Sequence, residues 1–357
     1  MASSLASFYR GKKVLVTGHT GFKGGWLTCW LKILGAHVIG FALPPDTRPN
    51  LFDAATIDRN MVSLFGDVRN FEELSRTFVE RSPEIVIHCA AQALVRRSYR
   101  EPVETFATNV MGTLHVLEGA RHTPSVRAVV VVTSDKCYEN REWFWGYREQ
   151  DAVGGRDPYS SSKGCAELVT AAYRHSFFAS DRRAAIGSAR AGNVIGGGDW
   201  SEDRLMPDIV RGISSGTKIV IRRPDSIRPW QHVLEVVRGY LLLAQRLCED
   251  GHRYAEAWNF GPSDESAIPV AEFAKRTVAM WGKGEIDIRA DLEAQHEAKY
   301  LRLNCDKARN YLGWQPSLTI DQALEWSVDW YRLYYENPAS ALPVIETQIQ
   351  RYMRMFS

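Results

Sequence analysis

A short apolar run followed at once by a glycine-rich turn constrains the fold of this chain more than any other feature. Residues 13–17 read Lys-Val-Leu-Val-Thr, and glycines then recur every third position to give Gly-x-x-Gly-x-x-Gly before an apolar helix predicted over 25–34. Glycine there permits a tight turn, close approach of a pyrophosphate to the backbone, and close packing of the helix on a sheet. The sequence therefore predicts a dinucleotide-binding turn. Its predicted cofactor-binding residues are Gly18, His19, Gly21, Phe22, Lys23 and Gly24.

Strand-like and helix-like segments alternate through the first half of the chain. Strands are predicted at 13–17, 37–42, 84–89 and 128–133, and helices at 25–34, 71–81, 102–121 and 159–178. The strands are continuously apolar, as in a parallel sheet that is covered on both faces. The expected fold is an α/β doubly wound parallel sheet of the Rossmann type over residues 1–190.

After residue 190 the pattern changes to glycine- and proline-containing loops, short strands and three clear helices. The helices are predicted at 234–248, 270–280 and 320–335. Residues 191–357 are therefore expected to form mainly a smaller mixed α/β cap that binds the substrate, with the chain crossing back into the first domain.

The composition excludes several classes of protein. The 44 Lys and Arg against 42 Asp and Glu leave a net charge of +2, without the basic excess of a nucleic-acid binder. No run of 18 apolar residues and no secretory h-region is present, so a cytoplasmic protein without membrane contact is expected. The six cysteines lack zinc-like spacing, and no metal site is expected.

Four further residues are candidates for cofactor binding. Asp67 and Val68 follow a predicted strand end and could hold the adenine end, although Asp67 could equally be the N-cap of the helix at 71–81. Ala90 and Ala91 provide small side chains after the strand at 84–89. Residues 40–44 lack the acidic residue that usually binds the adenosine ribose, so this stretch does not distinguish NAD from NADP.

The chemically reactive residues are predicted at the end of the valine-rich strand and at the start of the helix that follows it. Ser134, Asp135 and Lys136 come directly after the strand, and Tyr159 and Lys163 share one helical face. A lysine ammonium beside a phenol favours the phenolate and is expected to lower its pKa. With a serine hydroxyl on the same substrate oxygen, this set could remove a hydroxyl proton while hydride leaves for a nicotinamide.

With these motifs, nearly the whole chain resembles the extended short-chain dehydrogenase/reductase family, in its nucleotide-sugar branch. The resemblance implies that Tyr159 and Lys163 are catalytic together with Ser134. By the same resemblance Asn109, the asparagine of the family's Asn-x-x-Gly-Thr helix, binds the cofactor, as do Tyr159 and Lys163. It also implies bound NAD, a sugar-nucleotide substrate, and a homo-oligomer formed through the helices at 102–121 and 159–178.

The residues after Ser134 indicate which reaction is expected. Epimerases of this family carry no acid/base pair there, whereas 4,6-dehydratases usually have Asp-Glu, the Asp protonating the C6 hydroxyl and the Glu removing the C5 proton. This chain has Asp135-Lys136. That pair and the stretches 18–24, 137–140, 192–200 and 228–232 resemble the 4,6-dehydratase branch that acts on CDP-glucose. Dehydration of CDP-glucose, in a pathway to deoxysugars of surface polysaccharide such as the O-antigen, is the implied function.

Two questions stay open at this point. Lys136 could be the C5 base if it is neutral, or it could hold Asp135 or the 4-keto oxygen by charge while another group acts as base. The alternatives to the implied function are a nucleotide-sugar 4-epimerase, a 4,6-dehydratase of another nucleotide sugar, and a non-catalytic protein that keeps the fold. The last would be expected to lack Ser134, Tyr159 or Lys163, and all three are present.

Substrate contacts are expected from the second half of the chain. By the resemblance, Asn193 contacts substrate just past a strand, and Arg228 binds the diphosphate, for which a bidentate guanidinium is suited. Tyr300 is a further substrate-binding candidate. Asp199, Trp200 and His296 could line the cleft, but turn capping and packing explain them equally well.

Overall fold

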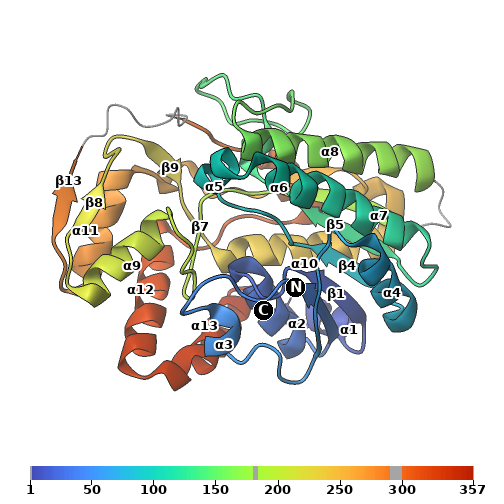
Figure 1. The fold of residues 1–357 in the computed structure, drawn as a ribbon, viewed down its shortest axis with the longest axis horizontal. Helices are drawn as coiled ribbons and strands as arrows, with labels where there is room; N and C mark the ends of the chain where they lie inside the picture. The colour runs from blue at the N-terminus through green and yellow to red at the C-terminus, as the bar shows by residue number, and fades with distance from the viewer. Residues whose placement is uncertain (1, 180–183, 290–299, 357) are drawn as a thin grey trace.

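A seven-stranded parallel sheet forms the centre of the structure, which is a computed structural model describing residues 2–179, 184–289 and 300–356 (Figure 1). The strands lie in the order β11-β6-β5-β4-β1-β2-β3, and all their pairings are parallel. Their bounds are β1 (Lys13–Thr17), β2 (His37–Ala42), β3 (Val62–Phe65), β4 (Ile85–His88), β5 (Ala128–Val132), β6 (Ala185–Arg190) and β11 (Ala257–Asn259). The strand order reverses between β1 and β4, which is where ligands bind in sheets of this kind. The predicted doubly wound fold is confirmed.

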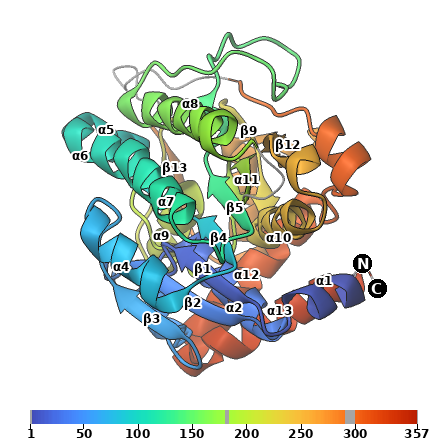
Figure 2. The same cartoon turned by 90° about the vertical axis from the view of Figure 1, so that its right-hand side faces the viewer.

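Both faces of this sheet are covered, as the apolar strands predict. Along β1, Val14 and Val16 belong to one buried cluster, whereas Leu15 belongs to the cluster on the opposite face. Figure 2 shows the two layers of helices on either side of the strands. One layer contains α4 (Phe71–Arg81), α7 (Gly112–Arg121) and α8 (Pro158–Phe177), and the other contains α1 (Ala2–Tyr9), α2 (Phe22–Ile33), α10 (Val233–Asp250) and α13 (Ala341–Arg354).

The predicted helix at 102–121 is one rod with a change of winding inside it. It consists of α6 (Pro102–Phe106), a π-helical turn at Ala107–Met111, and then α7. A π turn adds a residue to the helical circuit and is frequent at functional sites. Here it carries Asn109. Short helices α3 (Leu51–Ala54) and α5 (Val95–Arg100) lie in loops before it.

Beyond β6 the chain builds a second group of elements and returns twice to the sheet. Figure 1 places α9, α11 and α12 together beside one end of the sheet. The elements there are β7 (Val194–Ile195), α9 (Leu205–Ser215), β8 (Ile219–Ile221), β9 (Ile227–Pro229), β10 (Gln231–His232), β12 (Ala267–Pro269), α11 (Val270–Trp281), β13 (Ile286–Ile288) and α12 (Ile320–Glu336). The returns are α10 with β11, and α13, which packs on α2. The domain boundary near residue 190 stays a prediction.

Two observations bear on expected absences. Within the described ranges, every helix falls short of the length and apolar content that a membrane span needs. In that same part of the chain, no group of three or more His, Cys, Asp or Glu side chains could hold a metal ion, and the six cysteines are free.

One buried carboxylate ties α10 to the C-terminal third of the chain. Glu235 accepts hydrogen bonds from the backbone N–H groups of Ser317 at 2.8 Å and Leu318 at 2.7 Å, and from the hydroxyl of Tyr352 at 2.5 Å. The side chain is fully buried. Three donors would therefore lose their partner if this carboxylate were removed.

We predict that Glu235→Ala lowers the free energy of unfolding by about 3 kcal/mol, because it leaves three buried donors unsatisfied. The matched control is Asp250→Ala at the exposed end of the same helix, where the carboxylate pairs only loosely with the exposed Arg253, and this variant should cost less than about 0.5 kcal/mol. Urea denaturation measures both. Equal losses in the two variants would contradict the role of Glu235.

Candidate active site

The glycine turn after β1 fits a bound pyrophosphate. Gly18 has a φ of +77°, and a Cβ there would lie 2.7 Å from the backbone nitrogen of Ala90. A Cβ at Gly24 would overlap the carbonyl oxygen of Gly18. By contrast, a Cβ at Gly21 would meet only one atom, at 3.5 Å, and no side chain caps the helix that begins after this residue. Two glycines are thus needed for packing, and the third leaves the helix N-terminus open to an anion.

His19 is part of the floor of this turn. Its Nε2 lies 2.8 Å from the hydroxyl of Ser63, and its ring lies where a Cβ on Gly40 would be. Burial lowers the pKa of His19 to about 4, so the imidazole is neutral at physiological pH. His19 therefore joins β1 to β2 and β3 as an uncharged group.

Lys23 connects the glycine turn to the reactive residues. Burial, and then the charge of Arg204, lower the pKa of Lys23 to about 8, while the nearby carboxyl groups of Asp135 and Asp199 act in the opposite direction. Phe22 approaches the other side, since a Cβ on Gly196 would lie 3.1 Å from its ring. The first helical turn of α2 therefore faces the loop after β7 and the end of β5.

The predicted reactive turn after β5 is a closed, buried structure. Ser134 begins a 3₁₀ turn at Asp135–Cys137 and accepts a hydrogen bond from the backbone N–H of Lys136 at 3.2 Å. Its hydroxyl donates to Asp135 Oδ1 at 3.0 Å. The Asp135 carboxylate also packs on Gly192, where a Cβ would overlap it. Ser134 and Gly192 thus hold Asp135 from two sides.

Tyr159 lies against this turn at the start of α8. Asp157 caps the helix by accepting from the backbone N–H of Ser160 at 2.9 Å, and the Tyr159 N–H donates to the Ser98 hydroxyl at 3.1 Å. Burial raises the pKa of Tyr159 to about 12; a hydrogen bond with Ser134 opposes this shift and the charge of Asp135 adds to it. Ser134, Asp135 and Tyr159 are therefore brought together as the sequence predicts.

The expectation that Lys163 lowers the pKa of the Tyr159 phenol is wrong for the chain without bound ligands. The Nζ of Lys163 donates to the carbonyl of Val132 at 3.3 Å, and burial together with the charge of Lys23 lowers the pKa of Lys163 to about 8. Burial of Tyr159 outweighs any lowering of its pKa by the lysine. In this chain the phenol is protonated at neutral pH.

Asn109 has a supporting position next to this group. Its Oδ1 accepts from the backbone N–H of Gln92 at 2.9 Å, and its Nδ2 donates to the Gln92 carbonyl at 3.0 Å and to the Ser162 hydroxyl at 2.8 Å. The amide therefore joins the loop after β4 to α8. Ala90 and Ala91, in that same loop, are partly exposed.

The structure decides one alternative for Asp67. Asn70 caps α4 by accepting from the backbone N–H of Glu73, so the N-cap interpretation of Asp67 is wrong. Asp67 instead forms an ion pair with Arg69 at 2.6 Å. Although burial raises the pKa of Asp67, the hydrogen bonds from Arg69 lower it overall. Val68 is buried and packs where a Cβ on Gly112 would lie.

The three substrate-binding candidates lie in different places. Asn193 follows Gly192 beside the reactive turn and has a φ of +49°. Arg228 is buried on β9, and Tyr300 contacts Asn140 through its carbonyl and Arg302 through its ring. Trp200 packs on Trp330 and neighbouring rings, Asp199 accepts from Arg204, and His296 lies outside the described residues.

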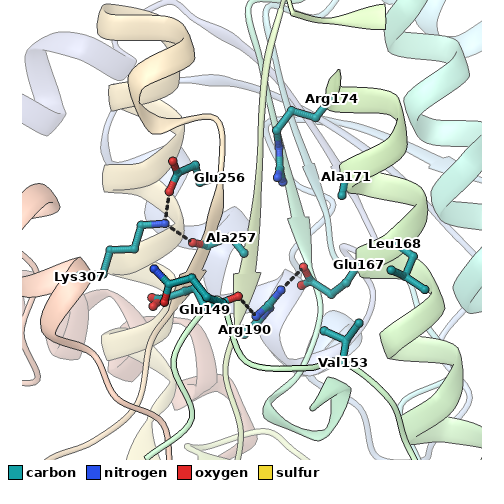
Figure 3. Close-up of a pocket in the computed structure, with 11 residues that line it drawn as sticks. Glu149, Val153, Glu167, Leu168, Ala171, Arg174, Arg190, Glu256, Ala257 and Lys307 are labelled. Carbon is teal, nitrogen blue, oxygen red and sulfur yellow. Dashed lines mark hydrogen bonds and ion pairs between the residues drawn. The ribbon is translucent and has the colours of Figure 1, made fainter. Parts of the chain in front are cut away.

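Sequence reasoning missed a buried ion pair behind the reactive turn. Glu167 accepts from Arg190 at 2.8 Å, from Ser188 at 2.7 Å and from the Thr133 hydroxyl at 2.5 Å. Figure 3 shows this pair in the wall of a pocket of about 240 Å³, which also contains Lys307 and Glu256. The α8 residues that line the pocket begin at Glu167, about two turns along the helix from Tyr159. The three carboxylates and three cations that line this pocket balance in charge. The sequence did not indicate this ion pair, or Arg204 near Lys23, because each of these residues looks like an ordinary charged residue.

The glycine turn, the Ser134–Tyr159 contact and buried Lys163 on a doubly wound sheet define an extended short-chain dehydrogenase/reductase. Residues 15–326 match the family model described as GDP-mannose 4,6 dehydratase, and the chain belongs to this family. It is 51% identical over 332 residues to a CDP-glucose 4,6-dehydratase of Salmonella typhimurium, with 92% of each chain covered.

Solved structures share the fold. An epimerase, Mth375 from Methanothermobacter thermautotrophicus, superposes with a TM-score of 0.80 at 25% identity, covering 96% of this chain and 98% of that one. A dTDP-glucose 4,6-dehydratase of Bacillus anthracis in complex with NAD gives 0.75 at 22% identity, covering 91% and 98%.

We predict that Lys163 makes stability increase with pH above 8. Its pKa is about 8 in the folded chain and near 10.5 when unfolded, so the unfolded state binds more protons between these values. From pH 8 to 9.5 the wild type should gain about 1.5 kcal/mol relative to Lys163→Met. Urea denaturation at both pH values measures this difference.

The exposed Lys283 provides the control, because Lys283→Met should change stability with pH as the wild type does. Identical pH dependence in the wild type and Lys163→Met would contradict a lowered pKa of Lys163.

Proposed function

We propose that this protein catalyses the NAD-dependent 4,6-dehydration of CDP-D-glucose to CDP-4-dehydro-6-deoxy-D-glucose. The observation that carries the proposal is the Asp135 carboxylate, buried beside Ser134 and Tyr159. Oxidation and reduction at C4 alone need no such acid, whereas loss of the C6 hydroxyl does. The choice of CDP-glucose is supported by the relative that is 51% identical to the chain.

The cofactor-binding residues proposed from the sequence suit a dinucleotide. Gly21 leaves the start of α2 open for the pyrophosphate, Lys23 brings a positive charge to it, and Ala90 permits close approach. Bound NAD would accept hydride from C4 of the sugar and return it to C6, so the net reaction is redox-neutral. The adenine end falls to Asp67 and Val68 in this proposal.

Tyr159 and Ser134 act at O4 of the sugar. The Ser134 hydroxyl orients O4, and Tyr159 removes its proton as the C4 carbonyl forms. Because the phenol is protonated in the chain alone, Tyr159 needs a positive charge supplied with the bound ligands to act as a base. Lys163 supports this group from the wall of the site, and Asn109 fixes α8 beside it.

Asp135 and Lys136 act on the neighbouring carbons. The 4-ketone acidifies the C5–H, Asp135 in its carboxylic-acid form donates a proton to O6 and becomes a carboxylate, and water leaves as the C5–C6 double bond forms. Return of hydride to C6 and of a proton to C5 would then complete the product. Lys136 is the proposed C5 base, because it directly follows Asp135 in the turn that carries the proposed acid. Asn193, Arg228 and Tyr300 are the proposed contacts to the nucleotide sugar.

Other properties stay predictions from the sequence. These are the cytoplasmic location, the homo-oligomer through α6, α7 and α8, and a place in the synthesis of deoxysugars for surface polysaccharide. The exposed apolar residues Val103 on α6 and Leu168 on α8, with Met111 in the π turn between α6 and α7, agree with a dimer contact.

The proposed function is tested by incubating the purified protein with CDP-glucose in D₂O without added cofactor. The product should have lost one water, carry one deuterium at C5, and form without net production of reduced nicotinamide. GDP-mannose, dTDP-glucose and UDP-glucose are the comparison substrates. A product of unchanged mass would indicate epimerisation, and preferred turnover of another nucleotide would overturn the choice of CDP-glucose.

A leaving-group experiment separates Asp135 from Tyr159. CDP-6-deoxy-6-fluoroglucose loses fluoride, which needs no protonation, and gives the same product with loss of hydrogen fluoride in place of water. We predict that Asp135→Asn lowers kcat for CDP-glucose by about 10²–10³-fold relative to the wild type. On the fluoro substrate the same variant should keep most of the wild-type kcat. Tyr159→Phe should lose activity on both. Equal losses on the two substrates in Asp135→Asn would contradict its role as the acid.

A further inference from the structure

We propose that Gln231 is a positioning residue for the dehydration step: it holds the Gly192–Asn193 segment against Asp135 and so fixes the carboxylate that protonates the C6 hydroxyl. The inference rests on the proposed function and adds a residue to it. Gln231 lies on β10, and strands β6 to β9 separate it in the sequence from the reactive turn at Asp135–Cys137. Its side chain is uncharged, so nothing in the sequence indicates a role in the site.

Gln231 is tied to the segment that it supports by both its main chain and its side chain. Its backbone N–H donates to the carbonyl of Asn193 at 3.2 Å. Its Nε2 donates to the carbonyl of Gly192 at 3.2 Å and to the carbonyl of Phe260 at 2.8 Å. The residue is 2% exposed, so these bonds are not in competition with bulk water.

The bond to Phe260 anchors this connection in the central sheet. Phe260 directly follows β11, and its backbone N–H donates to the carbonyl of Arg190 at the end of β6 at 2.8 Å. By contrast, the Gly192–Asn193 segment has little regular structure of its own, because β7 and β10 pair over only two residues. The side-chain amide of Gln231 therefore links the Gly192–Asn193 loop to the central sheet and fixes where the loop lies.

Gly192 passes this position on to Asp135 by packing. A Cβ at residue 192 would overlap the Asp135 carboxylate, so the carboxylate lies directly against the glycine backbone. The Ser134 hydroxyl holds the other side of the carboxylate at 3.0 Å. If Gly192 moved away, Asp135 would be free to rotate, and if it moved inward, it would displace the acid.

The side-chain amide of Gln231 lowers the stability of the fold in one respect. Its Oε1 is buried with no hydrogen-bond partner in the described part of the chain, and an unsatisfied buried acceptor is destabilising. An apolar side chain would fill the same space without that acceptor. The two N–H donors, which hold Gly192 and Phe260, are what the amide provides.

The test uses Gln231→Met, which keeps the side-chain volume and removes the donors. The matched control is Gln348→Met on α13, because Gln348 is also buried, donates through Nε2 to the carbonyl of Trp326 at 2.8 Å, and has an unpartnered Oε1. Both variants are assayed with CDP-glucose and CDP-6-deoxy-6-fluoroglucose, and their folding is checked by urea denaturation.

We expect Gln231→Met to lower kcat for CDP-glucose by about 10–100-fold, since small displacements of a catalytic group cost up to this much. The kcat for the fluoro substrate should change less than about threefold, with KM little altered for either. Gln348→Met should keep both rates. Gly192→Ala, which displaces Asp135 from the same side, should show the same preference for the fluoro substrate and provides a second variant should Gln231→Met fold poorly.

Equal losses on the two substrates in Gln231→Met, or in Gly192→Ala where the first variant does not fold, would overturn the inference. Wild-type rates in Gln231→Met would overturn it as well. Both results leave the proposed function intact, because that depends on dehydration of CDP-glucose by the wild type. A wild type that does not dehydrate CDP-glucose would overturn the proposed function and the inference with it.

Discussion

The close approach of the first glycine turn to the loop after β4 is the constraint on which the site depends. A Cβ at residue 18 would lie only 2.7 Å from the Ala90 backbone, so no residue other than glycine fits there while the two strands keep their pairing. This contact occurs where the strand order reverses, so α2 begins on one side of the crevice and the chain that carries Asn109 begins on the other. The carboxyl ends of β1, β4 and β5 therefore lie next to one another at the same edge of the sheet, and the proposed reactive side chains come directly after them in the chain.

Burial determines the charges in that place. It lowers the pKa of Lys23 and of Lys163 to about 8 and raises that of Tyr159 to about 12. Both shifts favour neutral groups, as expected where water is excluded. The same exclusion strengthens the effect of any ligand charge, because fewer solvent dipoles oppose it. At neutral pH both lysines still keep most of their charge and Tyr159 keeps its proton, so the charge of a bound ligand can change the ionisation of these groups.

Local patterns predicted the parts of the molecule that are locally determined. The helix at 71–81 follows from its helical periodicity and the strand at 13–17 from its continuous apolar run. The contact of Ser134 with Tyr159 follows from their places at a strand end and a helix start. The π turn, the return of β11 to the sheet and the Glu167–Arg190 pair depend on partners far along the chain. No nearby residue indicates them. Asp67 shows the limit well, because Asn70 three positions later is an equally good cap and has the better geometry.

The fold alone does not distinguish the reactions that this scaffold supports. An epimerase superposes with a TM-score of 0.80 and a dehydratase with 0.75, so the difference must lie in a few side chains. In the proposed mechanism, Tyr159, Ser134 and Lys163 serve the oxidation that both reactions share. What elimination adds is a proton donor next to the leaving hydroxyl, and a donor that rotates freely is a poor one. In the proposed mechanism, the carboxyl group of Asp135, held between a serine hydroxyl and a glycine backbone, meets this need in its protonated form, and the glycine at 192 would then matter to the chemistry although it carries no reactive group.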